Sequence, residues 1–252
     1  MVNDLASIVI LTYNRLEYLK HCLASVVDKA GYEPVEIIVV DSGSSDGTRQ
    51  YLLELLAQNR IQQVVLNSSN RYAGAAVNQG FKLARGQFLI RSDDDMVYNR
   101  GWLKTLVDAL QKIPNGILQV AVYGDLVPDG KVTHFHDAIE INGVTLRELK
   151  IGGCNMALTR QGFEQLGYFE EIPIAEDRNY CRRALQHNFV VGQIATATGT
   201  HIDHPGCSLC LRYTTYSQYR LQTLLRLKEH GRPFPFEGDY RLYEQWLKNE
   251  EG

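Results

Sequence analysis

The chain has 252 residues, of which 44% are hydrophobic, and its 26 basic and 29 acidic residues give a formal net charge of −3. This length and apolar content are sufficient for one sizeable buried core. Because there is no basic excess, nothing favours nucleic acid as a partner, and no acidic block indicates a disordered tail.

Five cysteines, an odd number, are spread over a chain that is long enough to be stable without disulfides, which favours reduced thiols. The N-terminal apolar run is short, lacks a basic leader and is not followed by a cleavage-type sequence. No run of about 18 apolar residues occurs in the chain. We therefore expect a cytoplasmic protein without a signal peptide or a membrane-spanning segment.

The first half of the chain alternates between short apolar runs and segments whose apolar residues recur at helical spacing. The runs predicted as buried strands are 7–11, 35–40, 61–66 and 86–90. The segments predicted as helices are 16–26, 48–58 with Asp46 or Thr48 as a cap, 73–84 and 101–112. This alternation on short connections predicts an α/β fold, with a mostly parallel, Rossmann-like sheet flanked by helices.

Polar clusters follow three of the predicted strands. They are TYN (12–14), DSGSSDGT (41–48) and RSDDD (91–95). In open parallel sheets, ligands bind outside the carboxyl ends of the strands, so we expect the clusters to share one rim. Taken singly, 41–48 is better explained by a solvated loop with a helix cap, and 12–14 can be explained as a strand end.

Three adjacent carboxylates, Asp93, Asp94 and Asp95, repel one another, and folding alone gains nothing from crowding them. If the segment is extended, Asp93 and Asp95 point to one side and Asp94 to the other. Two carboxylates on one side suit Mg²⁺ or Mn²⁺ with positions left open for phosphate oxygens. An aspartate-rich turn without a metal is the alternative. The chain has no Walker loop and no G-x-G-x-x-G after the first strand, so a nicotinamide-dependent dehydrogenase is poorly supported.

Four segments in order resemble the N-terminal half of a family 2 glycosyltransferase with the GT-A fold: SIVILTYNR, VEIIVVDSGSSDGT, NRYAGAAVNQGFKLARGQFLIRSDDDMV and GWL. The stretch 152–191 is similar to the second signature of that family, in which a glycine-rich strand and a GxF turn precede a Glu-Asp pair that opens a helix. The resemblance covers about residues 6–205. It implies Mn²⁺ or Mg²⁺, a nucleotide-diphosphate sugar as donor, and inverting transfer to a hydroxyl of a glycan, a lipid-linked or another small acceptor.

The resemblance also implies a role for each matching residue. The nucleotide pocket would be lined by Thr12, Tyr13, Asn14 and Asp41, and Asn70 and Asn78 would lie beside the donor. The donor would also be contacted by Asp93 and Asp94, and the metal would be bound by Asp95 and His204. The general base would be Asp177, with Glu176 and His136 on the acceptor side. Since a carboxylate can accept an N–H from a uracil or guanine edge, Asp41 favours a UDP- or GDP-type donor. Without the resemblance, acidic residues at 176–177 are explained by the dipole of a helix N-terminus.

We expect residues 1–115 to form the nucleotide-sugar-binding half, which ends after the D-x-D motif, and 116–210 to form the acceptor-binding half of the same domain. Residues 211–252 fall outside the signatures and are predicted to be a helical extension. An amphipathic helix within 211–230 could contact the inner membrane face or a second subunit, or pack on its own domain.

Two clusters allow a metal interpretation outside the resemblance. His201, His204, Cys207 and Cys210 recur at intervals of three, but structural zinc sites usually join two ligand pairs across a longer loop. HFHD (134–137) is predicted to belong to a β-hairpin that turns at 142–143. Two other functions stay open. A sugar-phosphate nucleotidyltransferase would need a basic, glycine-rich loop near the first strand, whereas a catalytically silent nucleotide-sugar-binding module would not need an intact Asp93, Asp95 and Asp177 set.

Overall fold

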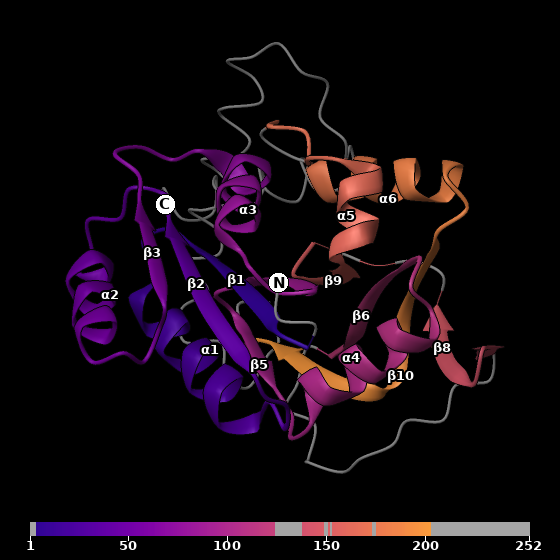
Figure 1. The fold of residues 1–252 in the computed structure, drawn as a ribbon. Helices are drawn as coiled ribbons and strands as arrows, with labels where there is room; N and C mark the ends of the chain where they lie inside the picture. The colour runs from indigo at the N-terminus through magenta and orange to yellow at the C-terminus, as the bar shows by residue number, and fades with distance from the viewer. Residues whose placement is uncertain (1–3, 124–137, 149–150, 152, 173–174, 203–252) are drawn as a thin grey trace, which may run out of the picture. The chain divides into compact units, whose positions relative to one another are not determined.

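A mixed sheet of ten strands organises the described part of the computed structural model, which covers residues 4–123, 138–148, 151, 153–172 and 175–202 (Figure 1). The strands are β1 (Ala6–Thr12), β2 (Val35–Asp41), β3 (Gln63–Leu66), β4 (Phe88–Asp93), β5 (Met96–Tyr98), β6 (Gly116–Tyr123), β7 (Ile139–Ile141), β8 (Val144–Glu148), β9 (Asn155–Thr159) and β10 (Val190–His201). The helices are α1 (Leu16–Lys29), α2 (Thr48–Ala57), α3 (Tyr72–Leu83), α4 (Trp102–Lys112), α5 (Arg160–Leu166) and α6 (Glu176–Gln186). All of these elements belong to one compact unit, residues 1–213.

The strand order is β3-β2-β1-β4-β9-β6-β10-β8-β7, with β5 beside β10. Strands β1 to β4 pair in parallel, as the alternating sequence pattern predicts. In their register Thr12 lies opposite Asp41, and Leu11 lies opposite Asp93. The three polar clusters therefore end at one edge of the sheet, which confirms the predicted shared rim.

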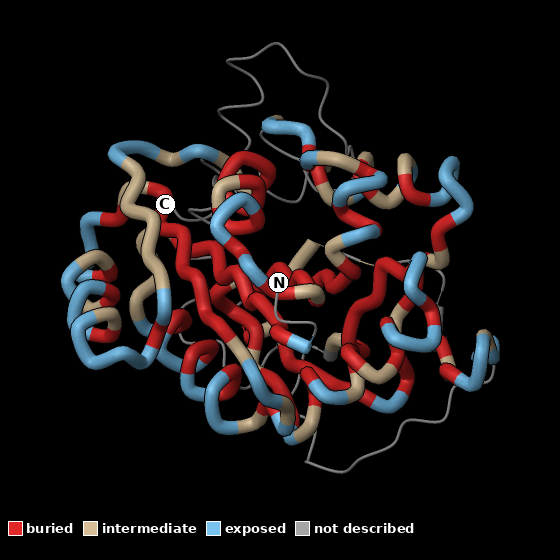
Figure 2. The backbone as a smooth tube through the Cα atoms, in the orientation of Figure 1, coloured by how far each residue is buried: buried red, intermediate tan, exposed pale blue. Residues whose placement is uncertain are grey.

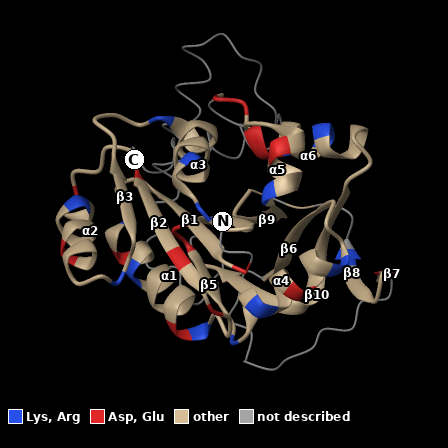
Figure 3. Cartoon of the chain, viewed as in Figure 1, with Lys and Arg blue, Asp and Glu red and all other residues tan. Residues whose placement is uncertain are grey.

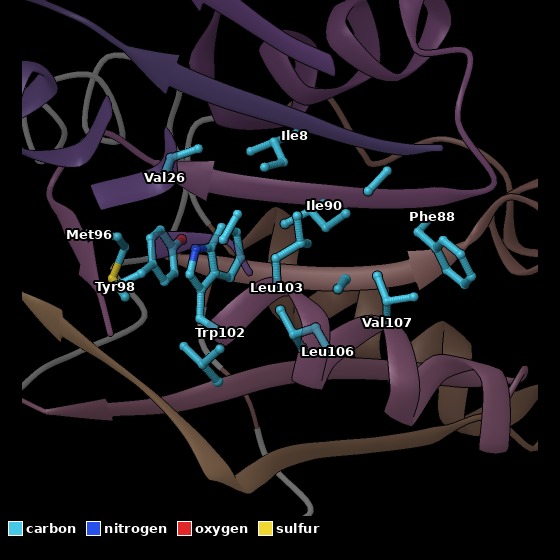
Figure 4. Close-up of a cluster of buried hydrophobic side chains, with 14 of the residues drawn as sticks. Ile8, Val26, Phe88, Ile90, Met96, Tyr98, Trp102, Leu103, Leu106 and Val107 are labelled. Atoms are coloured by element: carbon cyan, nitrogen blue, oxygen red, sulfur yellow. The ribbon is translucent and has the colours of Figure 1, made fainter. Parts of the chain in front are cut away.

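Helices cover both faces of the sheet because successive strand side chains point to opposite sides. Ile8 and Ile10 of β1 pack in one core with apolar residues of α1, α2 and α4, whereas Val9 and Leu11 pack in another with residues of α3, α5 and α6. The central strands are accordingly buried along their length (Figure 2). In the first core, the Tyr98 and Trp102 rings stack 3.9 Å apart (Figure 4).

Strand β4 is longer than the sequence indicates. The predicted strand ends at residue 90, but the observed one continues through Asp93. The antiparallel strand β9 lies alongside β4, where Arg91 pairs with Met156 and Ser92 with Asn155. This long-range pairing supplies backbone hydrogen bonds to polar residues that, by local composition, look like a loop.

Strand β10 bends, with a register shift between Ile194 and Thr198. It pairs with β6 on both sides of this shift. Its first part also pairs with β8, and its last residues pair with β5, so that His201 lies opposite Met96. The predicted hairpin that turns at Asn142 and Gly143 is present as β7 and β8. The cluster 134–137, which the same prediction included, lies outside the described residues.

The predicted division at residues 115 and 210 stays a prediction, as does the helical extension 211–252, which lies outside the described residues. The two predicted halves share one sheet, because β9 and β6 of the second continue from β4 of the first. Among the residues that the structure describes, no helix is both long enough and apolar enough to cross a membrane.

Glu36, the second residue of β2, is a buried charge that is 1% exposed. Its carboxylate accepts hydrogen bonds from Ser7 Oγ at 2.6 Å and from the Arg85 backbone N–H at 2.6 Å, and it forms an ion pair with the Arg85 guanidinium at 2.8 Å. Burial raises the pKa of Glu36, but these bonds outweigh burial and lower it below its ordinary value of 4.5. The bonds tie β1, β2 and the start of β4 together.

We expect Glu36→Gln to lower the free energy of unfolding at pH 7 by about 1–3 kcal/mol, because a neutral amide leaves buried donors unmatched. A group with a lowered native pKa stabilises above its unfolded pKa and loses that contribution as the pH falls through its native pKa. The difference from wild type in urea unfolding should therefore shrink as the pH falls below the ordinary value of 4.5. Glu164→Gln, on the exposed side of α5, is the matched control, and a pH-independent difference would contradict the assignment.

Candidate active site

The ends of β1 and β4 are joined by a buried network around Asp94 and Arg15. Thr12 Oγ1 donates to Asp94 Oδ2 at 2.7 Å, and the Arg15 guanidinium contacts Asp94 at 3.2 Å and Asp95 at 2.8 Å. Asp94 is 2% exposed, and burial raises its pKa, which Arg15 opposes. Its oxygens are directed at Thr12 and Arg15, so in this structure Asp94 braces the rim, whereas its predicted contact with the donor stays a prediction.

Of the three aspartates, Asp95 has the lowest pKa. Its Oδ2 accepts from Arg15 at 2.8 Å and contacts Nε2 of His201 at 2.9 Å. Burial raises the pKa of Asp95, but Arg15 and His201 outweigh it and hold the pKa well below its usual range. The pKa of His201 is raised in turn, because Asp95 outweighs the lowering effect of burial. The bend of β10 is what brings His201 to this carboxylate.

The loop 41–48 is structured around its own carboxylates. Asp41 is fully buried and accepts from the backbone N–H of Ser44 at 3.1 Å, while Arg49 Nη1 contacts it at 3.2 Å. Asp46 accepts from the backbone N–H groups of Thr48 and Leu16, at 3.1 and 3.0 Å, and so supports the first turns of α2 and α1. The N-cap position of α2 itself is Gly47. A base-reading role for Asp41 stays a prediction.

Asn14 links this loop to the end of β1. Its backbone N–H donates to Ser44 Oγ at 2.8 Å, and its side-chain oxygen accepts from the Ser45 backbone N–H at 2.7 Å. Tyr13 is half-buried next to it. The segments 12–14 and 41–48 therefore form one hydrogen-bonded wall of the rim.

The residues predicted on α3 have mainly local partners. Asn70 Oδ1 accepts from the Tyr72 backbone N–H at 2.9 Å, where α3 begins. The buried amide of Asn78 exchanges two hydrogen bonds of 2.9 Å with the backbone of Phe169. A side chain on Gly74 would collide with the Glu170 carbonyl, so this glycine allows α3 to approach the 169–171 segment. Both polar atoms of Asn78 are thus used to join α3 to that segment, which leaves its predicted donor contact without geometric support.

The second carboxylate motif opens α6, as the sequence predicts. Glu176 is 7% exposed, and its Oε1 lies 3.0 Å from Nη1 of Arg91, whose Nη2 lies 3.4 Å from Asp93 Oδ1. Asp177 is half-buried, its Oδ1 accepts from the Arg178 backbone N–H at 2.7 Å, and its Oδ2 faces Gly153. Burial raises the pKa of Asp93, and Arg91 opposes that rise. Figure 3 colours these carboxylates red and the arginines blue.

The surroundings of Asp95 show whether these residues suit a divalent cation. Its Oδ1 is buried and has no hydrogen-bond partner among the described residues. In the described part of the chain no three His, Cys, Asp or Glu side chains already lie close enough to hold a metal ion. Mg²⁺ and Mn²⁺ commonly use one or two carboxylates and complete their coordination with phosphate and water. Asp95, with Asp93 and His201 beside it, fits that mode.

The sequence did not assign three cations to the site: Arg15, Arg91 and His201. His201 was named only as part of a zinc pattern, and the predicted metal ligand His204 lies outside the described residues, as do Cys207, Cys210 and His136. The one local signal for Arg91 was its position directly after the apolar run that ends at residue 90 and next to three aspartates. Its partners were not visible, because they depend on the position of α6.

The mixed sheet carries a D-x-D motif at the end of β4 and an acidic pair at the start of α6, an arrangement that resembles the GT-A class of glycosyltransferases. The model of the family described as "Glycosyl transferase family 2" matches residues 7–167, more than half of the chain, and the chain belongs to this family. It is 28% identical over 111 residues to the glycosyltransferase GlyG of Streptococcus pneumoniae serotype 4, covering 44% of this chain and 36% of that protein. It is 31% identical over 137 residues to a dolichyl-phosphate beta-glucosyltransferase of Saccharomyces cerevisiae, covering 51% and 41%. The chain thus spans well under half the length of both relatives.

Solved structures show the same fold. The mannosyltransferase PcManGT from Pyrobaculum calidifontis, in complex with GDP-Man and Mn²⁺, aligns with a TM-score of 0.65 at 17% identity, over 94% of this chain and 68% of that one. GalNAc-T7 with UDP, GalNAc and Mn²⁺ aligns with a TM-score of 0.65 at 18% identity, over 79% and 44%. The predicted GT-A fold is therefore confirmed.

Proposed function

We propose that this protein is a metal-dependent, inverting glycosyltransferase that moves a sugar from a UDP- or GDP-type donor to an acceptor hydroxyl. The observation that supports it most is the bridge from Asp93 through Arg91 to Glu176. Through it the D-x-D motif and the acidic pair of α6, 81 or more positions apart in the sequence, meet at one place. Solved relatives that hold GDP-Man or UDP together with Mn²⁺ support the donor class and the metal.

In this proposal each group on the rim has one task. Asp95, with Asp93 and the deprotonated form of His201, would hold Mn²⁺ or Mg²⁺, and the ion would supply positive charge to neutralise the departing diphosphate. Asp177 takes the proton of the acceptor hydroxyl as its oxygen attacks the anomeric carbon. Two observations support this role for Oδ2 of Asp177: the Arg178 backbone N–H engages Oδ1 instead, and Gly153, which faces Oδ2, has no side chain. Direct displacement by one base inverts the anomeric centre.

The acceptor and the location in the cell belong to the same proposal. A glycan, a lipid-linked or another small acceptor suits a base at the mouth of the site. Segment 211–230 would contact a membrane surface, which could carry a lipid-linked acceptor, or a second subunit. This segment lies outside the described residues.

A thermal-shift experiment tests the donor class and the metal together. UDP or GDP with Mn²⁺ at about 100 times the Kd should stabilise the fold by about 2.7 kcal/mol. For a domain of this size that raises Tm by roughly 5–10 °C. Nucleotide alone and Mn²⁺ alone should each shift Tm much less, because the ion bridges the two, and ADP should shift it less than UDP or GDP. Equal shifts with and without Mn²⁺, or equal shifts for all bases, would count against this assignment.

A further inference from the structure

Arg91 is a buried cation within the sheet. It is 2% exposed and follows the apolar residues Phe88, Leu89 and Ile90 along β4. Removing a guanidinium from water is unfavourable unless carboxylates at close range compensate it. Strand alternation places Arg91 and Asp93 on the same face as Leu89, the face that packs against α3, α5 and α6.

Its two ion-pair partners come from the two carboxylate motifs of the site. Nη2 lies 3.4 Å from Asp93 Oδ1, at the end of the same strand, and Nη1 lies 3.0 Å from Glu176 Oε1, at the first residue of α6. Both Glu176 and Arg91 are almost fully shielded from water, whereas the Asp93 side chain is 31% exposed. The guanidinium therefore connects an element of the donor side to an element of the acceptor side.

Asp177 lies against the same group. A Cβ placed on Gly153 would be 3.1 Å from Arg91 Nη2 and 3.0 Å from Asp177 Oδ2, so these two atoms flank one point. An arginine guanidinium stays protonated in proteins, so the positive charge of Arg91 is permanent. Arg91 thus forms ion pairs with Asp93 and Glu176, and Asp177 lies on the far side of the same point from its Nη2.

We propose that Arg91 is a positioning residue that sets the first turn of α6, and with it Asp177, relative to the metal-binding end of β4. This inference rests on the proposed function. It adds that the donor-side and acceptor-side motifs are coupled by one ion pair, Arg91 with Glu176. Arg91 itself touches neither the donor nor the reacting atoms.

A purely structural role and a positioning role predict opposite changes in metal binding. If Arg91 only held the fold together, its removal would loosen the rim and weaken Mn²⁺ binding. If it positions α6, its removal takes a positive charge away from Asp93 and leaves the rim intact. Mn²⁺ should then bind as tightly as in the wild type or roughly two- to tenfold more tightly, from the lost repulsion alone.

The experiment compares Arg91→Met with wild type and with Arg60→Met, an exposed arginine after α2. Mn²⁺ affinity is measured by electron paramagnetic resonance titration without nucleotide. Hydrolysis is followed on whichever of UDP-glucose, UDP-GlcNAc and GDP-mannose the wild type turns over. We expect kcat of Arg91→Met to fall about 10²-fold, the usual cost of misplacing a catalytic group by about 1 Å, with the donor KM within about threefold. Arg91→Lys keeps the charge and should recover part of the loss.

Weaker Mn²⁺ binding by Arg91→Met, or an unchanged kcat, would overturn the proposal. Should Arg91→Met fail to fold, Glu176→Gln removes the same ion pair and leaves Arg91 paired with Asp93. It should show the same kcat loss, and adding Arg91→Lys to it should cost little more, because both changes break one interaction. If the kcat losses of the two single variants instead added up in the double variant, Arg91 and Glu176 would not act through one ion pair. A wild type that hydrolyses no donor would refute the proposed function instead, while the Mn²⁺ titration still reports on Arg91.

Discussion

Asp177→Asn is expected to abolish most of the sugar transfer, with a fall in rate of about 10²–10⁴-fold, the usual contribution of a general base. The amide keeps the shape of the side chain and can still accept from the Arg178 backbone N–H, so α6 should begin as before. The donor and the metal bind to other residues in the proposed mechanism. Donor affinity should therefore stay within about twofold, a difference of less than 0.5 kcal/mol.

Turnover at saturating donor and Mn²⁺, with donor binding by calorimetry, checks this expectation. Hydrolysis of the donor by water provides an assay before the acceptor is known. Asp28→Asn, the same chemical change on the exposed side of α1, is the matched control. A variant that turns over at the wild-type rate would remove Asp177 from the mechanism and make Glu176 the next candidate. If Asp177→Asn keeps donor binding and loses turnover, the protein is an enzyme and not only a nucleotide-sugar-binding module.

Asp95→Asn is expected to eliminate the metal-dependent part of nucleotide binding. Loss of a group that only supports a metal ligand typically weakens metal binding 10–100-fold, so loss of the ligand itself should cost at least about 10²-fold. Arg15 keeps its contact with Asp94 in the variant, which limits the cost to the fold. Asp95 is the residue of choice because its Oδ1 is buried without a hydrogen-bond partner in the described part of the chain.

Calorimetric titration of UDP or GDP, with and without Mn²⁺, measures the effect. Nucleotide binding by Asp95→Asn should be the same in both conditions, whereas the wild type should bind more tightly with the ion. Asp28→Asn should behave like the wild type. If the Asp95 variant keeps the full Mn²⁺-dependent gain, the aspartate triplet is not the metal site and the crowding of Asp93, Asp94 and Asp95 needs another cause.

Much of the donor side could be predicted, because its signals are local. Strand period and helix spacing located β1, β2, α2 and α3 to within a few residues, since each is decided by which side chains face the core. The shared rim of Thr12, Asp41 and Asp93 followed from topology, because parallel strands joined by helices end at the same edge. The hairpin that turns at 142–143 followed from its Asn-Gly pair.

The charge pairing in the site could not be predicted, because it is decided across long stretches of chain. Arg15 reaches Asp95 over 80 positions, and Arg91 meets Glu176 only once β4, β9 and α6 are packed. The bend of β10 brings His201 to Asp95, which no local pattern marks. The amide of Asn78, assigned to the donor by its motif, forms two hydrogen bonds with the backbone of Phe169, a long-range contact that no local pattern marks, and its donor role stays a prediction.

The sequence by itself determined the family, the α/β architecture and which carboxylates gather at the rim, because these depend on local periodicity and on motifs in a fixed order. Only the tertiary structure decided which cation neutralises which carboxylate: Arg15 and His201 for Asp95, and Arg91 for Asp93 and Glu176. Ion pairs require approach within about 4 Å. Apart from Arg91 with Asp93, these pairs join segments that are distant in the sequence and meet only when the sheet and helices are packed.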